Sequence, residues 1–424
     1  MNSRERIKLT LNHQEADRVP LDLGASPVTG MHVSSVYKLR QALGLDAPGT
    51  PVKVIEPYQM LGEIQPDLLD ALGADVIPLW SPDTMFGYPL VDWKPWTFFD
   101  GTPVLVPGGF NTKPETNGDI LMYPEGDPSL APSGRMPSGG FYFDAIVRQP
   151  PIDDNRLDPA DNLEEFQLVS KNHLDYYEQK AEYLYSHTDK AILGNFGGTG
   201  FGDIALVPGL QLRNPRGIRD MTEWYMSTIT RRDYIWRVFE GQCEIGLENL
   251  KRIHDRVGEK IDILYVSGTD FGAQNGPFIS PKAYRDLYQP FHEIINAWVH
   301  KNTSWKTFIH SCGSVIKLYP YFIEAGFDIL NPVQTSAADM DPVTLAEQFR
   351  DQVTFWGGGI DTQDTLPFGT PEAIRTQVRE RMQIFGRGGG FVFNPIHNVQ
   401  AGIPLENLLA LYQAVEDYRH YPLG

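Results

Sequence analysis

Short apolar runs alternate with longer segments of helical periodicity along most of this chain. Each apolar or β-branched run is followed by a turn, and then by apolar residues spaced three or four positions apart. Eight such runs predict strands at residues 19–23, 75–79, 191–196, 263–268, 307–311, 328–333, 354–360 and 391–396. Eight strands with helical crossovers predict an α/β fold, the (β/α)8 TIM barrel. The alternative is an open doubly wound sheet, but its nucleotide fingerprint does not follow the first run.

The clearest helical pattern covers residues 231–257. Its apolar face steps by three or four positions through Ile235, Phe239, Cys243, Gly246, Leu250, Ile253 and Val257. This spacing predicts one buried face of an amphipathic helix. Further helices are predicted at residues 281–300, 314–325, 342–350, 371–385 and 405–418.

Residues 82–151 break the alternation and hold 12 of the 33 prolines. Asp100-Gly101 and Asn117-Gly118 are hairpin signals, so we expect a β-rich antiparallel insertion after barrel strand 2, within a single barrel domain of residues 1–424. Insertions at strand ends lie at the catalytic mouth, which suggests a lid, whereas a surface decoration is the alternative. If the insertion is a lid, aromatic side chains in or beside it should line the pocket: Trp80, Trp93, Trp96 or Tyr123.

Composition narrows the class of protein. With 36 Lys+Arg and 54 Asp+Glu the net charge is −18, which argues against nucleic acid or an anionic membrane as the main partner. Two cysteines among 424 residues exclude a disulfide framework and favour a reducing compartment. No apolar run reaches membrane-spanning length, and the charged first residues do not resemble a signal peptide. We therefore expect a soluble cytoplasmic protein. Its oligomeric state stays open, with a homodimer as one alternative.

Polar side chains collect where the predicted strands end, which is where a barrel carries its chemistry. In chain order they are Asp22, Asn195, Asp270, His310, Cys312, Asn331, Gln334, Asp361 and His397. Asp270 and Asp361 are candidate catalytic acids or bases, although either carboxylate could instead cap a turn. Candidate substrate-binding side chains are Asn195, Asn331, Gln334, Trp80 and Trp96.

His310-Ser311-Cys312 is the strongest chemical signal. Residues two apart on a strand share a face, and imidazole and thiolate are preferred zinc ligands. His397 ends the last predicted strand, so the three side chains can converge on one Zn²⁺. The alternative is a buried thiol beside two hydrogen-bonded histidines. Cys243 lies on the apolar face of its helix and is interpreted as a core thiol.

Several segments together resemble the uroporphyrinogen decarboxylase superfamily, outside residues 82–151. They are Ser3-Arg-Glu-Arg, Asp17-Arg-Val-Pro, Gly276-Pro-Phe-Ile-Ser-Pro-Lys-Ala-Tyr, Phe308-Ile-His-Ser-Cys-Gly and Asn331-Pro-Val-Gln. The resemblance implies a (β/α)8 barrel with one of two activities. One arm decarboxylates a porphyrinogen, and the other comprises zinc-dependent methyltransferases that work with a corrinoid protein.

The match to the methyltransferase arm implies His310 and Cys312 as zinc ligands. His397 stands where that arm has a second cysteine, and Gln334 stands where it has a glutamate, so water, substrate or a carboxylate such as Glu56 would supply the fourth ligand. Arg40-Gln-Ala-Leu-Gly lacks the second arginine of the porphyrin-binding motif. A zinc ion with two histidines and one cysteine is a better Lewis acid than one surrounded by thiolates, so the expected activity is demethylation of a small donor, methoxylated or related, with the corrinoid on a partner protein. A decarboxylase and a catalytically silent binding barrel are the alternatives.

Overall fold

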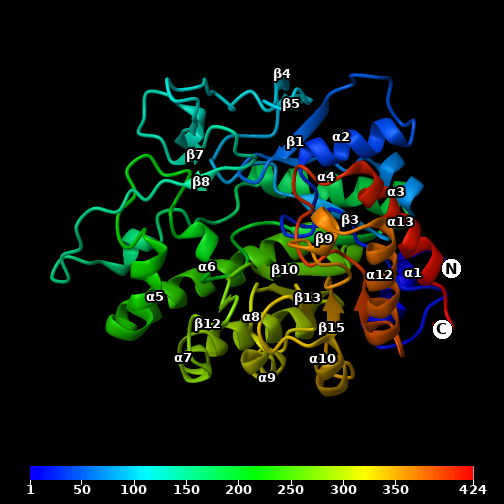
Figure 1. Cartoon of the computed structure of the whole chain (residues 1–424). Coiled ribbons are helices and arrows are strands. Elements are labelled where there is room, and N and C mark those ends of the chain that lie inside the picture. The colour runs from blue at the N-terminus through cyan, green and yellow to red at the C-terminus, as the bar shows by residue number, and fades with distance from the viewer. Residues whose placement is uncertain (424) are drawn as a thin grey trace.

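A parallel sheet of seven strands forms the centre of the molecule (Figure 1). The structure is a computed structural model that describes residues 1–423. The strands neighbour one another in the order β16-β15-β14-β13-β10-β9-β3. Their bounds are β3 (Val76–Trp80), β9 (Ala191–Asn195), β10 (Ile263–Ser267), β13 (Lys306–His310), β14 (Ile329–Asn331), β15 (Thr354–Trp356) and β16 (Phe391–Val392). Each coincides with a predicted run.

The eighth predicted strand, residues 19–23, joins the two edges of this sheet. Leu21 forms a parallel bridge with Phe393, and the N–H of Asp22 donates to the Phe393 carbonyl at 2.9 Å. On the other side, the N–H of Asp75 donates to the Leu21 carbonyl at 2.7 Å. The predicted (β/α)8 barrel is therefore confirmed, with its first strand reduced to a single bridge.

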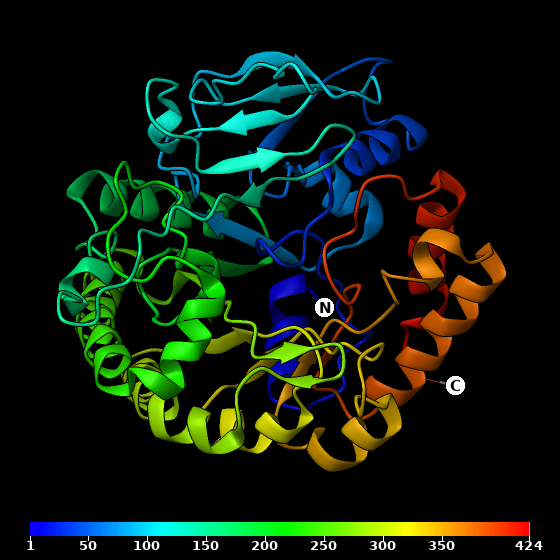
Figure 2. The ribbon, with the colours of Figure 1, turned by 60° about the vertical axis from the view of Figure 1, so that its left-hand side comes forward.

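Apolar side chains from all seven strands fill the barrel interior, as a barrel of this size requires. Helix α1 (Ser3–Leu11) adds Ile7 and Leu11 to this cluster, and in Figure 2 it lies in the middle of the ring of helices. The strand residues are Val76, Ala191, Leu193, Ile263, Phe308, Ile329, Trp356 and Val392. The interior is a packed core, which leaves the strand ends as the place for a site.

Helices surround the sheet in a ring (Figure 2). Their bounds are α2 (Val33–Ala42), α3 (Pro66–Leu72), α4 (Lys171–His187), α5 (Met221–Thr230), α6 (Arg232–Val257), α7 (Pro281–Leu287), α8 (Gln289–Asn302), α9 (Tyr319–Glu324), α10 (Pro342–Phe349), α11 (Thr365–Phe368), α12 (Pro371–Phe385) and α13 (Leu405–Tyr418). Within residues 1–423, none of these helices combines the length and apolar character needed to cross a bilayer.

Two predicted helices differ from the observed ones. The segment 281–300 is divided into α7 and α8, because Pro290 lacks the N–H that would continue the hydrogen-bonded ladder. The segment 314–325 is helical only from Tyr319 and is preceded by a 3-10 turn at Ile316–Leu318. The other four predicted helices match α6, α10, α12 and α13 to within one residue.

Residues 82–151 form the predicted antiparallel insertion. The strands β4 (Lys94–Thr97) and β5 (Pro103–Val106) are joined at Asp100-Gly101, and Gly101 has the positive φ of +86° that this turn requires. A second sheet comprises β6 (Ile120–Met122), β7 (Gly134–Met136) and β8 (Asp144–Ala145). In Figure 2 the insertion stands at one edge of the ring, and its role as a lid stays a prediction.

The insertion also recruits a strand that the sequence analysis missed. β1 (Val52–Glu56) lies before barrel strand 2 in the chain, yet it pairs in parallel with β5 and antiparallel with β2 (Leu61–Gly62). Its residues alternate between buried and half-buried positions, which is the signal that was overlooked. The insertion is thus anchored to the segment that follows α2.

Candidate metal centre

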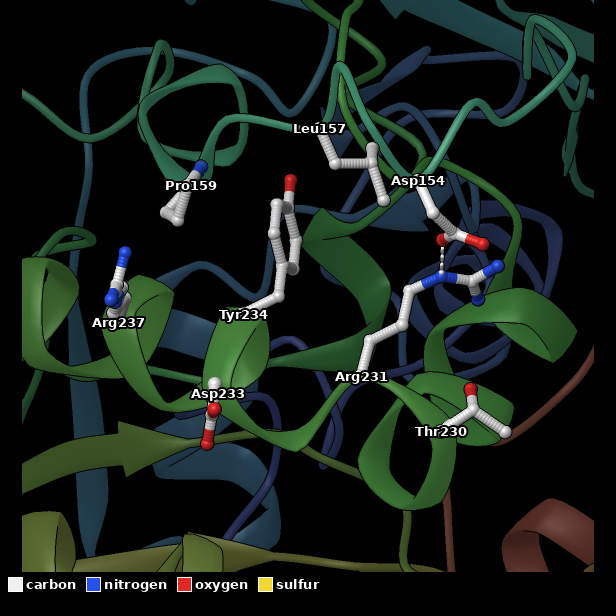
Figure 3. Close-up of a pocket in the computed structure, with 8 residues that line it drawn as sticks. All are labelled: Asp154, Leu157, Pro159, Thr230, Arg231, Asp233, Tyr234 and Arg237. Carbon is white, nitrogen blue, oxygen red and sulfur yellow. Dashed lines mark hydrogen bonds and ion pairs between the residues drawn. The ribbon is translucent and has the colours of Figure 1, made fainter.

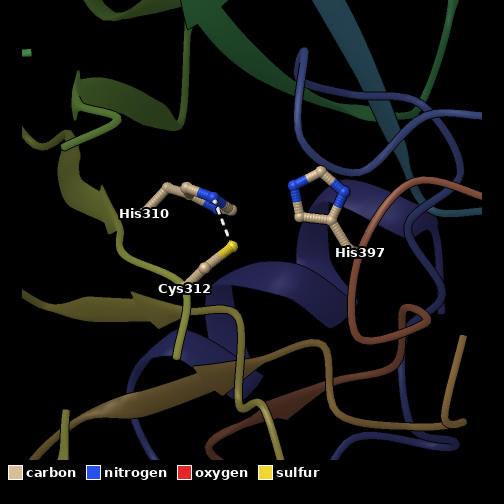
Figure 4. A group of neighbouring side chains, drawn as sticks. All are labelled: His310, Cys312 and His397. Atoms are coloured by element: carbon tan, nitrogen blue, oxygen red, sulfur yellow. Dashed lines mark hydrogen bonds between the residues drawn. The ribbon is translucent and has the colours of Figure 1, made fainter. Parts of the chain in front are cut away.

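His310, Cys312 and His397 point toward one another at the carboxyl ends of the barrel strands (Figure 4). His310 is the last residue of β13, Cys312 lies in the following turn, and His397 lies in the loop after β16. One ligand atom from each residue lies within 4.8 Å of the other two. The structure therefore brings together all three ligands that the sequence predicted.

A hydrogen bond from the His310 ring to Asn331 fixes the orientation of that ring. Asn331 Nδ2 donates to the Trp356 carbonyl at 2.8 Å, so its Oδ1 faces His310 Nδ1 at 2.6 Å as an acceptor. Nδ1 must then carry the ring proton, which leaves a lone pair on Nε2. That nitrogen lies 3.2 Å from Cys312 Sγ. Asn331 was expected to bind substrate, but both ends of its amide are occupied within the protein.

The turn that carries Cys312 depends on two glycines. Gly313 has φ +88°, and a Cβ there would lie 2.4 Å from the Gly272 carbonyl carbon. A Cβ on Gly272 would lie 2.6 Å from the Cys312 carbonyl oxygen. No side chain fits between these backbones, so glycine allows the two loops to touch. The contact is reinforced by the N–H of Cys312, which donates to Asp270 Oδ1 at 2.7 Å.

Burial sets the protonation states of the group. It lowers the pKa of His310 to about 4 and the pKa of His397 to about 4. Burial also raises the pKa of Asp270 and that of the Cys312 thiol. Both imidazoles are therefore neutral near pH 7, which is the form that binds a metal ion. A cation would relieve the cost of a buried thiolate at Cys312.

The loop of His397 is tied to segments before barrel strand 2 by its neighbour Asn398. Asn398 Oδ1 accepts the N–H of Gly30 at 2.6 Å, and its Nδ2 donates to the Pro27 carbonyl at 2.8 Å and to Gln59 Oε1 at 2.7 Å. Both ends of this buried amide therefore form hydrogen bonds with segments before barrel strand 2. These contacts hold the third candidate ligand in place.

A cavity of about 270 Å³ opens beside the group. Its lining includes the side chains of Cys312, His397, Gln274, Gln334, Thr362 and Gln363. Gln334 is the predicted substrate-binding residue found here, and its Oε1 also accepts the N–H of Gly313 at 2.7 Å. Gln274 and Gln363 were missed by the sequence analysis. Gln274 lies four residues after Asp270, and Gln363 lies two residues after Asp361. Their positions close to predicted strand ends could have identified them as candidate site residues.

Two other predicted site residues serve the backbone. Asn195 ends β9, and its Nδ2 donates to the carbonyl of Ala25 at 2.9 Å. Asp361 Oδ1 accepts the N–H of Gln363 at 2.7 Å and that of Asp364 at 3.3 Å, so its carboxylate caps the turn. The turn-capping alternative describes Asp361 best, because these bonds hold its carboxylate against its own backbone.

The predicted aromatic contacts lie elsewhere. Trp96 packs edge-on against Phe98 and Phe110, with ring centroids 5.1 and 5.4 Å apart, inside the insertion. Among residues 1–423, the lining of the cavity includes neither Trp80 nor Trp96. Neither tryptophan therefore lines this cavity: Trp96 belongs to the core of the insertion, and Trp80 ends β3.

Glu56 and Asp203 are two further acidic side chains that accept backbone N–H groups. Glu56 was considered as a fourth ligand, but its two oxygens accept the N–H groups of Tyr58 and Gln59 at 3.0 and 2.7 Å. It lies outside the group of converging ligand atoms. Asp203, which the sequence analysis missed, accepts the N–H of Gly268 at 3.1 Å. Burial, and then the charge of Asp270, raise the pKa of Asp203 to about 6.

A second recess, of about 400 Å³, lies at the start of α6 (Figure 3). Its lining includes Asp154, Arg231, Asp233 and Arg237. Arg231 pairs with Asp154 and with Glu223, so its charge is already balanced by protein groups. The recess contains no converging ligands among the described residues, and the cavity beside His397 is therefore the candidate site.

Comparison with known proteins agrees with this geometry. Residues 265–418, which contain all three candidate ligands, match the family "Uroporphyrinogen decarboxylase (URO-D)". The predicted resemblance to this superfamily is confirmed. A methylated-thiol–coenzyme M methyltransferase of Methanosarcina mazei is 27% identical over 41% of this chain. Uroporphyrinogen decarboxylases of Coxiella burnetii are 27% identical over 34% of it.

The sequence matches to these superfamily members are partial. They cover 48% of the methyltransferase and 38% of the decarboxylase, which is less than two thirds of either relative's own length. The solved structure of a methyltransferase from Methanosarcina mazei aligns with 99% of this chain and 99% of its own. Its TM-score is 0.54 at 14% identity, so that likeness shows the shared fold alone.

Proposed function

We propose that this protein is a zinc-dependent methyltransferase that moves a methyl group from a small, methoxylated donor to a corrinoid carried by a partner protein. The observation that carries the proposal is the convergence of His310, Cys312 and His397, whose ligand atoms lie within 4.8 Å of one another beside a cavity. The methyltransferase relative, 27% identical over 41% of this chain, supports methyl transfer as the reaction.

The three side chains fit Zn²⁺ by their chemistry. Two neutral imidazoles and one thiolate are typical zinc ligands, and three protein ligands leave a position for substrate, as in catalytic zinc sites. His310 would bind through Nε2, because Asn331 occupies its Nδ1. Cys312 would bind through Sγ and His397 through a ring nitrogen.

With only one thiolate among its ligands, the metal would supply Lewis acidity towards a leaving oxygen rather than activate a thiol. In the proposed reaction the C–O bond of the donor breaks and its electron pair remains on oxygen. The methyl carbon forms its new bond to the acceptor. The leaving oxygen then takes up a proton. We assign the protonated carboxyl of Asp270 as the donor, because Asp270 Oδ1 lies 3.6 Å from His310 Nε2 and accepts the N–H of Cys312.

The decarboxylase alternative needs cationic side chains for a multiply carboxylated tetrapyrrole. Arg40, the nearest sequence match to that motif, forms bonds of 2.6–2.8 Å with the carboxylates of Asp46 and Asp67. Its guanidinium is thus occupied within the protein, in α2. This arrangement favours the methyltransferase over the decarboxylase.

Methyl transfer to free cob(I)alamin tests the proposal. Zinc-loaded wild type, supplied with methoxylated compounds, should form methylcobalamin, which is followed by its absorption spectrum. Cys312→Ser should lose this activity, and Cys243→Ser should keep it. Equal rates for wild type and Cys312→Ser would contradict the proposal. Bound zinc without turnover would favour the silent barrel, and release of CO₂ from a porphyrinogen by metal-free protein would favour the decarboxylase.

A further inference from the structure

The cavity beside the candidate metal centre is lined by neutral polar groups. Gln274, Gln334, Thr362 and Gln363 contribute its polar side chains apart from the ligands Cys312 and His397. Within residues 1–423, no lysine or arginine lines it. The volume of about 270 Å³ lies just below the range of about 300–1,000 Å³ that is typical of sites for drug-sized ligands, so the occupant is small.

Acidic side chains hold two of the lining residues. Asp270 accepts the N–H of Cys312, one of the lining residues. Asp361 accepts the N–H of Gln363, another lining residue. Asp203 is close enough to Asp270 for the charge of Asp270 to raise its pKa, and it has no cationic partner among the described residues. Within the described part of the chain no lysine or arginine lines the cavity, and the Cys312 thiolate and the nearby Asp203 carboxylate would offset the charge of a bound Zn²⁺, so an anionic ligand would gain no net electrostatic attraction here.

Hydrogen-bonding capacity in the cavity is limited to a few groups. Gln334 uses its Oε1 for the Gly313 N–H and its Nε2 for Gln274 Oε1 at 3.3 Å. Gln274 Nε2 in turn donates to the Ser336 carbonyl. Gln363 accepts from the Ser336 hydroxyl through Oε1 at 3.3 Å, and within residues 1–423 its Nε2 donates to no protein group. Within residues 1–423, the amide of Gln363 and the hydroxyl of Thr362 are thus the polar groups of these side chains that donate to no protein group, which leaves them fully available to a ligand.

We infer that the methyl donor is a small uncharged molecule whose oxygen accepts hydrogen bonds from Gln363 and Thr362. This inference rests on the proposed function and adds the substrate class to it. Neutral amide and hydroxyl donors suit an ether, hydroxyl or carboxamide oxygen, and they do not compensate a carboxylate. Gln363 is then a specificity-determining residue. Because its side chain is exposed and holds no backbone group, its replacement should leave the fold intact.

A matched pair of probes tests the inference. 2-Methoxybenzamide and 2-methoxybenzoate have nearly the same shape and differ in charge. Their dissociation constants are measured by ligand-observed NMR at pH 7.5 on the zinc-loaded full chain, without any corrinoid. Wild type should bind the amide at least tenfold more tightly than the carboxylate. Gln363→Lys should bring the carboxylate to within threefold of the amide or reverse the order.

Gln348→Lys is the control, because it adds the same charge at an exposed position of α10 outside the cavity lining. It should keep the wild-type ratio. Tighter or equal binding of the carboxylate by wild type, binding of neither probe, or an unchanged ratio in Gln363→Lys would overturn the inference. Failure of the proposed function is a separate result: absence of methyl transfer to cob(I)alamin, with the charge preference retained.

Discussion

The side-chain oxygen of Asn331 lies 2.6 Å from Nδ1 of His310, and this contact decides which nitrogen of the ring carries the proton. Because the other end of the amide donates to the Trp356 carbonyl, Asn331 cannot turn to present its NH₂ group to the ring without losing that bond. His310 Nε2 is consequently held, with its lone pair, 3.2 Å from Cys312 Sγ. A residue on β14 thus orients a ligand on β13.

Asn331→Ala should lower the zinc affinity about 10- to 100-fold, because outer contacts of this kind orient a metal-binding imidazole. Asn331→Asp keeps an acceptor for Nδ1 and should recover part of the loss. Asn302→Ala, at the exposed end of α8, should leave the affinity at the wild-type value. Competition with a chromophoric chelator measures all four proteins, and equal affinities for wild type and Asn331→Ala would contradict the assignment.

Gly313→Ala should lose both stability and metal binding. The added Cβ would lie 2.4 Å from the Gly272 carbonyl carbon, and a φ of +88° is also unfavourable for alanine. Gly388→Ala is a matched control, since Gly388 has φ +82° but open space around its Cβ position. Thermal unfolding should show a loss of about 1 kcal/mol for Gly388→Ala and a clearly larger one for Gly313→Ala. Similar losses would mean that the close approach of the two loops is unimportant.

The buried Glu56 carboxyl should make stability depend on pH. Burial raises its pKa from 4.5 to about 7, so the folded chain holds this proton more tightly than the unfolded chain does. Its contribution is complete below pH 4.5 and is lost as the pH rises through 7, by about 3 kcal/mol in total.

Glu56→Gln cannot ionise and should escape this loss. Between pH 5 and pH 8 the stability of the variant should therefore rise relative to wild type, as measured by urea unfolding at both pH values. The comparison removes the contributions of the other buried carboxyls. A stability difference that is the same at both pH values would show that Glu56 does not titrate in this range.

Local patterns predicted the barrel strands and the shared face of His310 and Cys312, because each depends on residues close in sequence. Short apolar or β-branched runs identified the strands, and His310 and Cys312 converge because they are two residues apart at a strand end. His397 followed from the barrel topology, which places the strand ends around one mouth.

Features that depend on distant contacts were not predictable in this way. The parallel pairing of β1 with β5 joins strands separated by residues 57–102, which include barrel strand 2, and nothing local specifies it. Asp361 has the same sequence context as a catalytic carboxylate, and only its bonds to Gln363 and Asp364 reveal a turn cap. The sequence around Trp96 does not indicate which residues it contacts. In the structure Trp96 packs against Phe98 and Phe110.

Zinc content and zinc coordination test the central claim most directly. Wild type grown with zinc and purified without chelator should hold about one ion per chain, with X-ray absorption giving one sulfur at about 2.3 Å and two imidazole nitrogens at about 2.0–2.1 Å. Cys243→Ser should give the same spectrum, because that thiol is buried in α6 away from the group. Cys312→Ser should lose the ion. A metal-free wild type, or a Cys312→Ser protein that retains its zinc, would contradict the account.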